Sequence, residues 1–166
     1  MPQNLEIKST YRSLTSARSK AKAIGAIPRG VLKQTDTYFN VRSGRLKLRE
    51  INGKQFELIY YNRPNARSTR YSDYTIVSLP QPGPAKALFR SLFGISVIVR
   101  KRRTLFLYKN ARIHIDSVKQ LGTFLEFEVV VKKGKRQAQQ LMKYLLKEFC
   151  VDSSMLIGGS YSDMIR

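Results

Sequence analysis

Cysteine is almost absent from this chain of 166 residues, which holds Cys150 alone, and tryptophan is absent altogether. One thiol excludes an internal disulfide and a zinc site built from several cysteines. Cys150 follows Phe149 at the end of an apolar helical pattern, so we expect a buried side chain with a structural role. The chain also lacks an apolar run of signal-peptide or membrane-spanning length. We therefore expect a cytoplasmic protein with no membrane partner.

Negative charge is scarce as well. The chain has 31 lysines and arginines against 11 aspartates and glutamates, a formal net charge of +20. An excess of this size indicates an anionic partner. Nucleic acid, a phosphorylated metabolite and an acidic membrane surface all satisfy that requirement. The length is that of one domain, residues 1–166, which can bury a core without disulfides or structural metal. It leaves a monomer and a homodimer equally open.

Short segments with alternating or β-branched residues dominate the chain, and turn signals separate them. Ser43-Gly44 and Asn52-Gly53 are typical hairpin turns, so the second to fourth segments should form a meander. The pattern predicts eight strands, at about residues 4–8, 35–41, 45–51, 55–62, 72–78, 97–108, 111–117 and 123–132.

Three segments have the spacing of amphipathic helices. They cover residues 14–24, with Gly25 as a stop, residues 85–93 before Gly94, and residues 136–149. Each apolar stripe needs an apolar surface to cover. The combination predicts an α+β, mainly antiparallel fold with about three helices outside a sheet.

Charged side chains share one face in several of the predicted strands, because successive side chains in a strand point to opposite sides. In residues 45–49, three cations alternate with Leu46 and Leu48. In residues 124–128, Glu126 and Glu128 lie side by side, with Leu125 and Phe127 on the other face. The same alternation groups Asn4, Glu6 and Lys8, then Lys101 and Arg103, then Arg112, His114 and Asp116.

A solvated sheet face is the simpler interpretation of any one such strand. Across five strands it is less satisfactory, because cations gather on some strands and carboxylates on others. Glu126 and Glu128 would lie about 7 Å apart along their strand, and in a partly enclosed site they would repel by about 2 kcal/mol. A divalent cation would relieve this repulsion, and an anion would relieve that among the cations. We therefore predict an eight-stranded closed β-barrel with a polar lumen that encloses one small ligand.

Many cations beside a cluster of carboxylates suit a polyphosphate bound with Mg²⁺ or Mn²⁺. These hard cations take oxygen ligands and bridge protein carboxylates to substrate phosphates. Arginine contacts phosphate through two parallel hydrogen bonds, and lysine contributes a point charge. The pattern predicts a site for a triphosphate-bearing small molecule.

Spaced motifs along nearly the whole chain resemble the CYTH family of triphosphate tunnel metalloenzymes. The Glu-x-Glu-x-Lys hallmark of the family matches residues 4–8, and residues 121–128 are similar to the class IV adenylate cyclase branch. Further matches lie at residues 34–39, 44–50, 99–103, 112–116 and 159–163.

The resemblance implies an eight-stranded tunnel that binds a triphosphate, such as ATP or inorganic triphosphate, with metal. The metal ligands that it implies are Glu6, Glu126, Glu128 and Asp116. The implied phosphate contacts are Lys8, Lys47, Arg49, Arg63, Lys101, Arg103 and Arg112, with Lys8, Lys101 and Arg103 in the catalytic set.

Asn4 departs from the hallmark, which has glutamate there. Its amide oxygen can still bind a metal but adds no charge, so we expect one tight metal and a second that depends on substrate. His114 is expected to be a hydrogen-bonded interior residue rather than a general base. Tyr38 and Tyr74 fit ligand contact, and aromatic packing accounts for them at least as well.

Three classes of function follow from these features. The first is a metal-dependent enzyme that either cyclises a nucleoside triphosphate or hydrolyses a triphosphate. The second is a binder of nucleotide, polyphosphate or RNA 5′-triphosphate without turnover. The third, ranked last, is general nucleic-acid binding by an exposed sheet. Arg100 and Arg102 alternate with Lys101 and Arg103 and should face solvent, so the tunnel leaves much of the basic charge unexplained.

Overall fold

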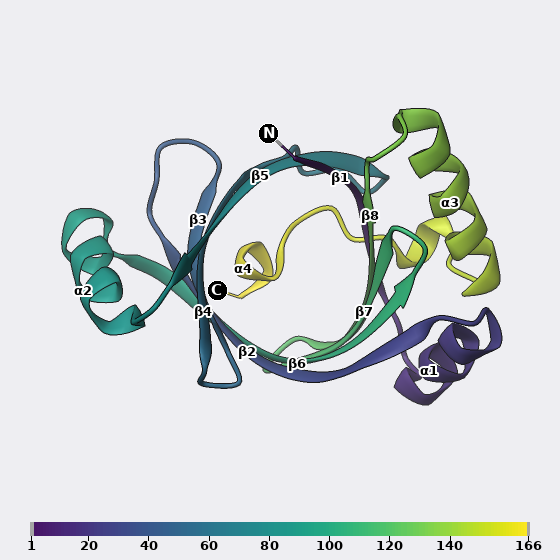
Figure 1. Cartoon of the computed structure of the whole chain (residues 1–166), viewed down its shortest axis with the longest axis horizontal. Helices are drawn as coiled ribbons and strands as arrows, with labels where there is room; N and C mark the ends of the chain where they lie inside the picture. The colour runs from purple at the N-terminus through teal and green to yellow at the C-terminus, as the bar shows by residue number, and fades with distance from the viewer. Residues whose placement is uncertain (1, 166) are drawn as a thin grey trace.

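Eight antiparallel strands close into a barrel in the computed structural model, which describes residues 2–165 (Figure 1). Their order around the barrel is β1-β5-β4-β3-β2-β6-β7-β8, and β8 pairs back onto β1. This confirms the predicted closed barrel. The strands are β1 (Gln3–Thr10), β2 (Ile27–Phe39), β3 (Arg45–Ile51), β4 (Gln55–Asn62), β5 (Arg70–Leu79), β6 (Ile95–Tyr108), β7 (Ala111–Val118) and β8 (Gly122–Val130).

The three predicted helices lie outside the barrel, α1 and α3 along one side and α2 at the opposite side (Figure 1). They are α1 (Leu14–Ala23), α2 (Pro82–Phe93) and α3 (Lys135–Glu148). After α3 the chain forms a short 3-10 turn (Ser153–Met155) and returns across the barrel opening to a one-turn helix, α4 (Tyr161–Met164). In the part of the chain that the structure describes, no helix is both long and apolar enough to span a membrane.

The apolar core lies between the outer wall of the barrel and the helices α1 and α3. Leu5 and Ile7 of β1 face outward and are at most 3% exposed. They belong to one buried cluster with Ile113 of β7, Phe127 of β8 and Leu145 of α3. Because this core takes the apolar side of β1, β7 and β8, their charged side is left to face the lumen.

The second strand is longer than the sequence indicated. It begins at Ile27 rather than near residue 35 and ends at Phe39, and its first half pairs with β6 from the Ile27–Leu107 register onward. Residues 27–31 are exposed and include Pro28 and Gly30, with Gly30 at a φ of 86° beside a register shift. A proline and a left-handed glycine are typical of loops, which is why the sequence pattern missed this pairing.

Two expectations about burial were wrong. Cys150 is exposed and has a left-handed φ of 55°, because the helix has already ended at Phe149, which takes the buried position. The α2 helix buries none of its residues. It contacts the barrel through Phe89, whose ring lies 5.5 Å from that of Phe39, and it leaves Leu92 exposed.

Candidate functional site

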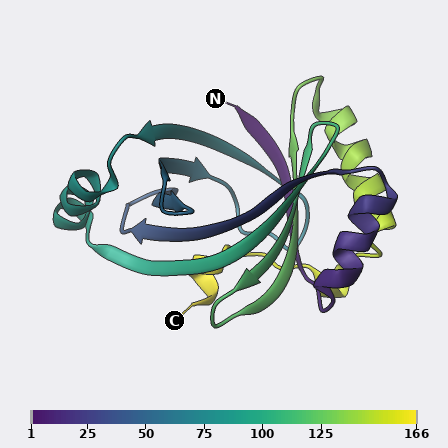
Figure 2. The same ribbon diagram turned by 60° about the horizontal axis from the view of Figure 1, so that its bottom comes forward.

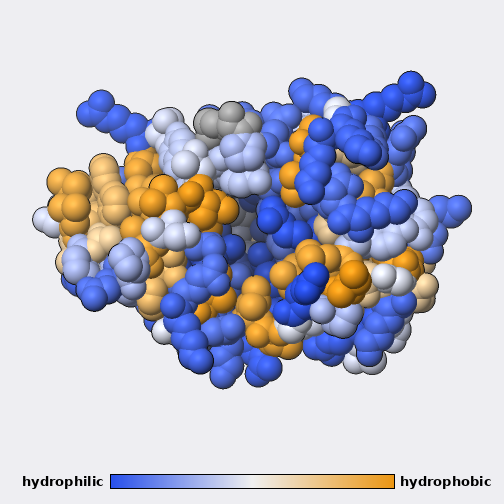
Figure 3. Space-filling model, viewed as in Figure 1, coloured by the Kyte–Doolittle hydropathy of each residue, from blue (hydrophilic) through white to orange (hydrophobic). Residues whose placement is uncertain are grey.

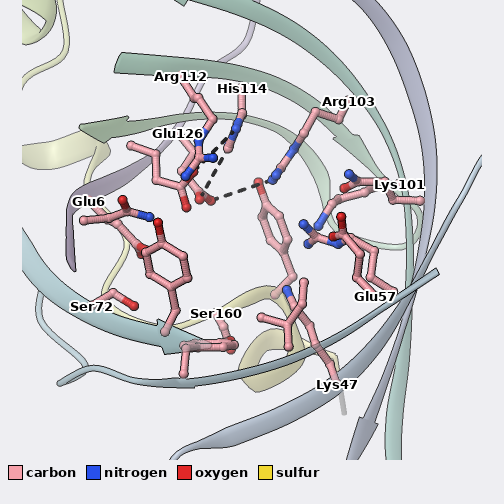
Figure 4. Close-up of a pocket in the computed structure, with 18 of the residues that line it drawn as sticks. Glu6, Lys47, Glu57, Ser72, Lys101, Arg103, Arg112, His114, Glu126 and Ser160 are labelled. Atoms are coloured by element: carbon pink, nitrogen blue, oxygen red, sulfur yellow. Dashed lines mark ion pairs between the residues drawn. The ribbon is translucent and has the colours of Figure 1, made fainter. Parts of the chain in front are cut away.

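The lumen of the barrel is a cavity of about 350 Å³ lined by alternate side chains of all eight strands. The space-filling view shows it as a hollow with hydrophilic walls (Figure 3), and the close-up shows charged side chains converging on it from opposite walls (Figure 4). This volume lies in the usual range for small-ligand sites. Every residue for which a site role was predicted lines the cavity except Asp116.

One wall gathers three cations around a single buried carboxylate. Asp36 of β2 is 1% exposed and accepts two hydrogen bonds from Arg49, each 2.7 Å long. Lys47 Nζ and Lys101 Nζ lie 3.0 Å and 3.2 Å from its Oδ2. Burial would raise the pKa of Asp36, but the charges of Arg49, Lys101 and Lys47 hold that pKa well below its usual value. Three positive charges thus share one negative charge.

Burial acts in the opposite sense on the lysines. It lowers the pKa of Lys101 well below its usual value, although Asp36 opposes the shift. It also lowers the pKa of Lys8, on the other wall, to about 8. These groups would be held more firmly in the charged form if a further anion entered the cavity.

Arg103 is fixed from behind by a residue that does not line the cavity. Its Nε and Nη2 donate to the two oxygens of Asp116 at 2.8 Å and 2.7 Å, and the Tyr161 hydroxyl donates to Oδ2 at 2.7 Å. Asp116 is 0% exposed, and the nearby charge of Arg103 lowers its pKa to about 2 against the effect of burial. Asp116 is thus paired with Arg103 and does not line the cavity with the glutamates, and its role as a metal ligand stays a prediction.

The three glutamates lie on neighbouring strands, each beside a cation. Lys8 Nζ is 3.3 Å from Glu126, and Arg112 Nε is 2.7 Å from Glu128. Glu6 forms a 2.5 Å ion pair with Arg63 and is the direct register partner of Glu128. Burial and the charge of Glu128 raise the pKa of Glu6 to about 7, and Arg63 offsets only part of this. The pKa values of Glu126 and Glu128 are instead lowered by neighbouring positive charges against the effect of burial, so Glu6 is the glutamate whose charge is stabilised least.

His114 is an interior residue, as the sequence indicated, but its Nδ1 lacks the expected hydrogen bond. The ring lies between two of these carboxylates. Its Nδ1 is 3.7 Å from Glu126 Oε1, and its Nε2 is 3.9 Å from Glu128 Oε2 (Figure 4). Both distances exceed that of a hydrogen bond. Burial, assisted by the charge of Arg103, lowers the pKa of His114 and favours the neutral ring.

The donors for a metal are present, although they do not converge as they stand. Among residues 2–165, no three His, Cys, Asp or Glu side chains form a group that could hold a metal ion. The glutamates nevertheless offer the oxygen ligands that Mg²⁺ and Mn²⁺ prefer. Beside them the buried oxygen of Asn4 has no hydrogen-bond partner. The raised pKa of Glu6 marks a charge that a cation would stabilise.

The C-terminal segment lies against the inner wall and adds Ser160 and Tyr161 to the cavity lining (Figure 1). Arg70 donates to the carbonyl oxygens of Ile157 and Gly159, which fixes the segment to β5. Lys8 Nζ lies 3.7 Å from the centre of the Tyr161 ring. Helical periodicity could not show this role, because four residues are too few for a helical period, and the motif match at residues 159–163 was the one sequence signal for this segment.

The comparisons with known proteins agree on the fold. The CYTH domain profile matches residues 2–149. The structure of PH1012 from Pyrococcus horikoshii OT3 is 22% identical, covers 98% of this chain and 99% of its own, and superposes with a TM-score of 0.89. A candidate adenylate cyclase from Vibrio parahaemolyticus is 15% identical, with coverages of 98% and 97% and a TM-score of 0.82. No curated protein matches the sequence.

Proposed function

The chain belongs to the CYTH domain family, and from this premise we propose that it is a divalent-metal-dependent enzyme that acts on a triphosphate. The proposal rests on one observation above all. The barrel encloses a cation cluster around Asp36 on one wall and the glutamates of β1 and β8 on another, within one cavity.

The phosphates would bind to the cations and take over part of the role of Asp36. Lys47, Arg49 and Lys101 already meet at that carboxylate, so an incoming phosphate finds them gathered in advance. Arg103 is held by both oxygens of Asp116, which leaves its orientation fixed. Such preorganised charge stabilises a phosphoryl transition state without reorganisation at the moment of reaction.

Glu6, Glu126 and Glu128 would hold Mg²⁺ or Mn²⁺, with the Asn4 oxygen as a neutral donor. When bound, the metal would neutralise charge on the phosphates and polarise the reacting phosphorus. Without a ligand, Arg63 pairs with Glu6 and Lys8 pairs with Glu126. A triphosphate would draw both cations to itself and leave the two carboxylates free for the metal. Phosphate and metal binding would then support each other.

Two reactions fit this site. In cyclisation, the ribose 3′-oxygen forms a bond to the α-phosphorus, and the bond to the departing pyrophosphate breaks. In hydrolysis, water attacks the terminal phosphorus and inorganic phosphate is released. Incubation of the protein with ATP, inorganic triphosphate and thiamine triphosphate, each with Mg²⁺ or Mn²⁺, distinguishes them. Cyclic AMP with pyrophosphate indicates the first reaction, and phosphate release without cyclic AMP indicates the second.

A binder without turnover is the second candidate, favoured by Asn4 and by carboxylates that are ion-paired rather than convergent. If the protein bound ATP, inorganic triphosphate and thiamine triphosphate tightly but formed no product with Mg²⁺ or Mn²⁺, it would be a binder and not an enzyme. A Glu126→Gln variant measured in parallel shows whether any turnover belongs to the cavity.

A further inference from the structure

The outer wall of the barrel carries a second, separate group of cations. β2 and β6 run side by side between α1 and α2 with no helix across them (Figure 2). On β1, β7 and β8 the outward side chains of the barrel are apolar and pack under α1 and α3. Here they are basic and polar, and they line a surface hollow of about 840 Å³. Six cations border this hollow, and one of them, Lys101, also lines the lumen. We call the other five the exterior basic face: Lys33, Lys54, Arg100, Arg102 and Lys119.

Strand register brings these cations together. Lys33 of β2 lies directly opposite Arg102 of β6, and Thr35 lies opposite Arg100. The Lys119 backbone N–H donates to the Arg100 carbonyl, which places the end of β7 beside them. The β3–β4 turn that carries Lys54 is held against β2, because Asn52 exchanges two hydrogen bonds with the Lys33 backbone. Three of the five cations thus lie on paired strands, and Lys54 and Lys119 lie in turns that are hydrogen-bonded to those strands.

The exterior basic face has little negative charge of its own. None of its five cations forms an ion pair within 4.0 Å among residues 2–165, whereas the lumen cations share Asp36, Asp116 and the glutamates. Glu50 is the carboxylate that borders the hollow, and Lys86 of α2 lies 3.4 Å from it. Like charges on adjacent strands repel one another. This repulsion would be relieved by a bound polyanion.

We propose that the exterior basic face binds the phosphate backbone of a double-helical nucleic acid, independently of sequence. The cations supply the charge that contacts phosphates, and Thr35, Asn52 and Ser117 add the neutral donors that commonly accompany them. No aromatic side chain is among the residues that line this hollow. Single-strand binders rely on aromatic platforms for base stacking, so the chemistry of this face favours a duplex.

The inferred site does not depend on the proposed function, because none of its five cations lines the lumen, although Gln34 and Lys101 border both the lumen and the hollow. Along β6, Arg100 and Arg102 are exposed on the outer face, and Lys101 and Arg103 alternate with them into the lumen. Removal of the outer cations should leave the cavity unchanged. Failure of one proposal can therefore be told from failure of the other.

The test is fluorescence anisotropy of a labelled 20-base-pair RNA duplex with the full chain, over a series of salt concentrations. If all five cations contact phosphates, log K should fall against log salt with a slope of about −4.5. The triple variant Lys33→Ala, Arg100→Ala, Arg102→Ala should bind at least about tenfold more weakly, with a slope of about −2. The matched control Arg136→Ala, Lys143→Ala, Lys147→Ala removes the same charge from the exposed side of α3 and should keep the wild-type slope.

Three further arms separate the alternatives. Single-stranded RNA of the same sequence and vesicles containing phosphatidylserine should bind more weakly than the duplex. Tripolyphosphate with Mg²⁺ is directed to the lumen. A concentration that fills the cavity should therefore leave the duplex bound. Equal losses in the two triple variants, or tighter binding of single strand or vesicle, would overturn the proposal. The thermal midpoints of both variants confirm that they are folded.

Discussion

Asp36 of β2 and Arg49 of β3 face each other across one register pair and form two parallel hydrogen bonds of 2.7 Å inside the barrel. The same carboxylate holds Lys47 and Lys101. A lone buried carboxylate among three cations leaves a net positive charge in a low-dielectric site, where charge is costly. An anion that binds beside Asp36 would neutralise this excess positive charge.

The substitution Asp36→Asn should destabilise the ligand-free protein by about 3–5 kcal/mol, because three buried cations lose their shared partner. Tripolyphosphate should then stabilise the variant more than it stabilises the wild type, since the anion replaces the missing charge. Urea unfolding with and without tripolyphosphate measures both effects. Asp73→Asn, at an exposed position on β5, is the control and should change stability by no more than about 0.5 kcal/mol. Equal stabilisation of wild type and Asp36→Asn would count against an anion at this cluster.

The Tyr161 hydroxyl should matter for both stability and phosphate affinity. Tyr161→Phe removes the hydrogen bond to Asp116, which is fully buried, and should cost about 1–3 kcal/mol. Because Asp116 orients Arg103, triphosphate should also bind less tightly. Calorimetric titration measures the affinity for triphosphate, and urea unfolding measures the stability.

Tyr144→Phe, on the exposed side of α3, is the control for loss of a hydroxyl. If Tyr144→Phe weakened triphosphate binding as much as Tyr161→Phe, the contact with Asp116 would have no role in affinity.

The raised pKa of Glu6 predicts a specific dependence of stability on pH. Its folded-state pKa of about 7 lies above the ordinary value of 4.5, so the folded state binds more protons than the unfolded state between these values. The stabilising effect is complete below about pH 4.5 and is lost as the pH rises through 7. Compared with wild type, Glu6→Gln should therefore lose less stability between pH 5 and pH 7.5. Urea unfolding in EDTA at the two pH values gives the difference, and parallel changes in both proteins would refute the shift.

Metal binding should depend on the glutamates of β8. Glu126→Gln removes one negative charge from the carboxylate cluster and should weaken Mn²⁺ binding in the presence of a triphosphate by about tenfold or more. Glu148→Gln, at the end of α3, gives a control with the same change of charge. Electron paramagnetic resonance of free Mn²⁺ measures the affinity, and chelation by EDTA should abolish any turnover. Unchanged Mn²⁺ affinity in Glu126→Gln would exclude that residue as a ligand.

Strand alternation was sufficient to predict the barrel and most of the lumen. Glu6 and Glu128 alternate with apolar residues that pack in the core, so their inward direction follows from the sequence. Asp36 lies between two threonines, where no apolar alternation marks the inner face.

Register explains what alternation missed. Alternation placed Asp116 on the same strand face as Arg112 and His114. Its pairing with Arg103 depends on the β6–β7 register, which only the folded chain provides. Tyr161 reaches the cavity through a long return of the C-terminal segment, and local sequence carries no signal for such a path.

The most direct test of the central claim is calorimetric titration of the protein with a non-hydrolysable ATP analogue in Mn²⁺, for wild type and Lys47→Ala. The account predicts one site per chain in the wild type and at least about tenfold weaker binding in the variant, because a charge-assisted contact to phosphate is lost. Arg102→Ala, which removes one charge from the outer face of β6, should bind as the wild type does. Equal affinity in Lys47→Ala and wild type would contradict a triphosphate site inside the barrel.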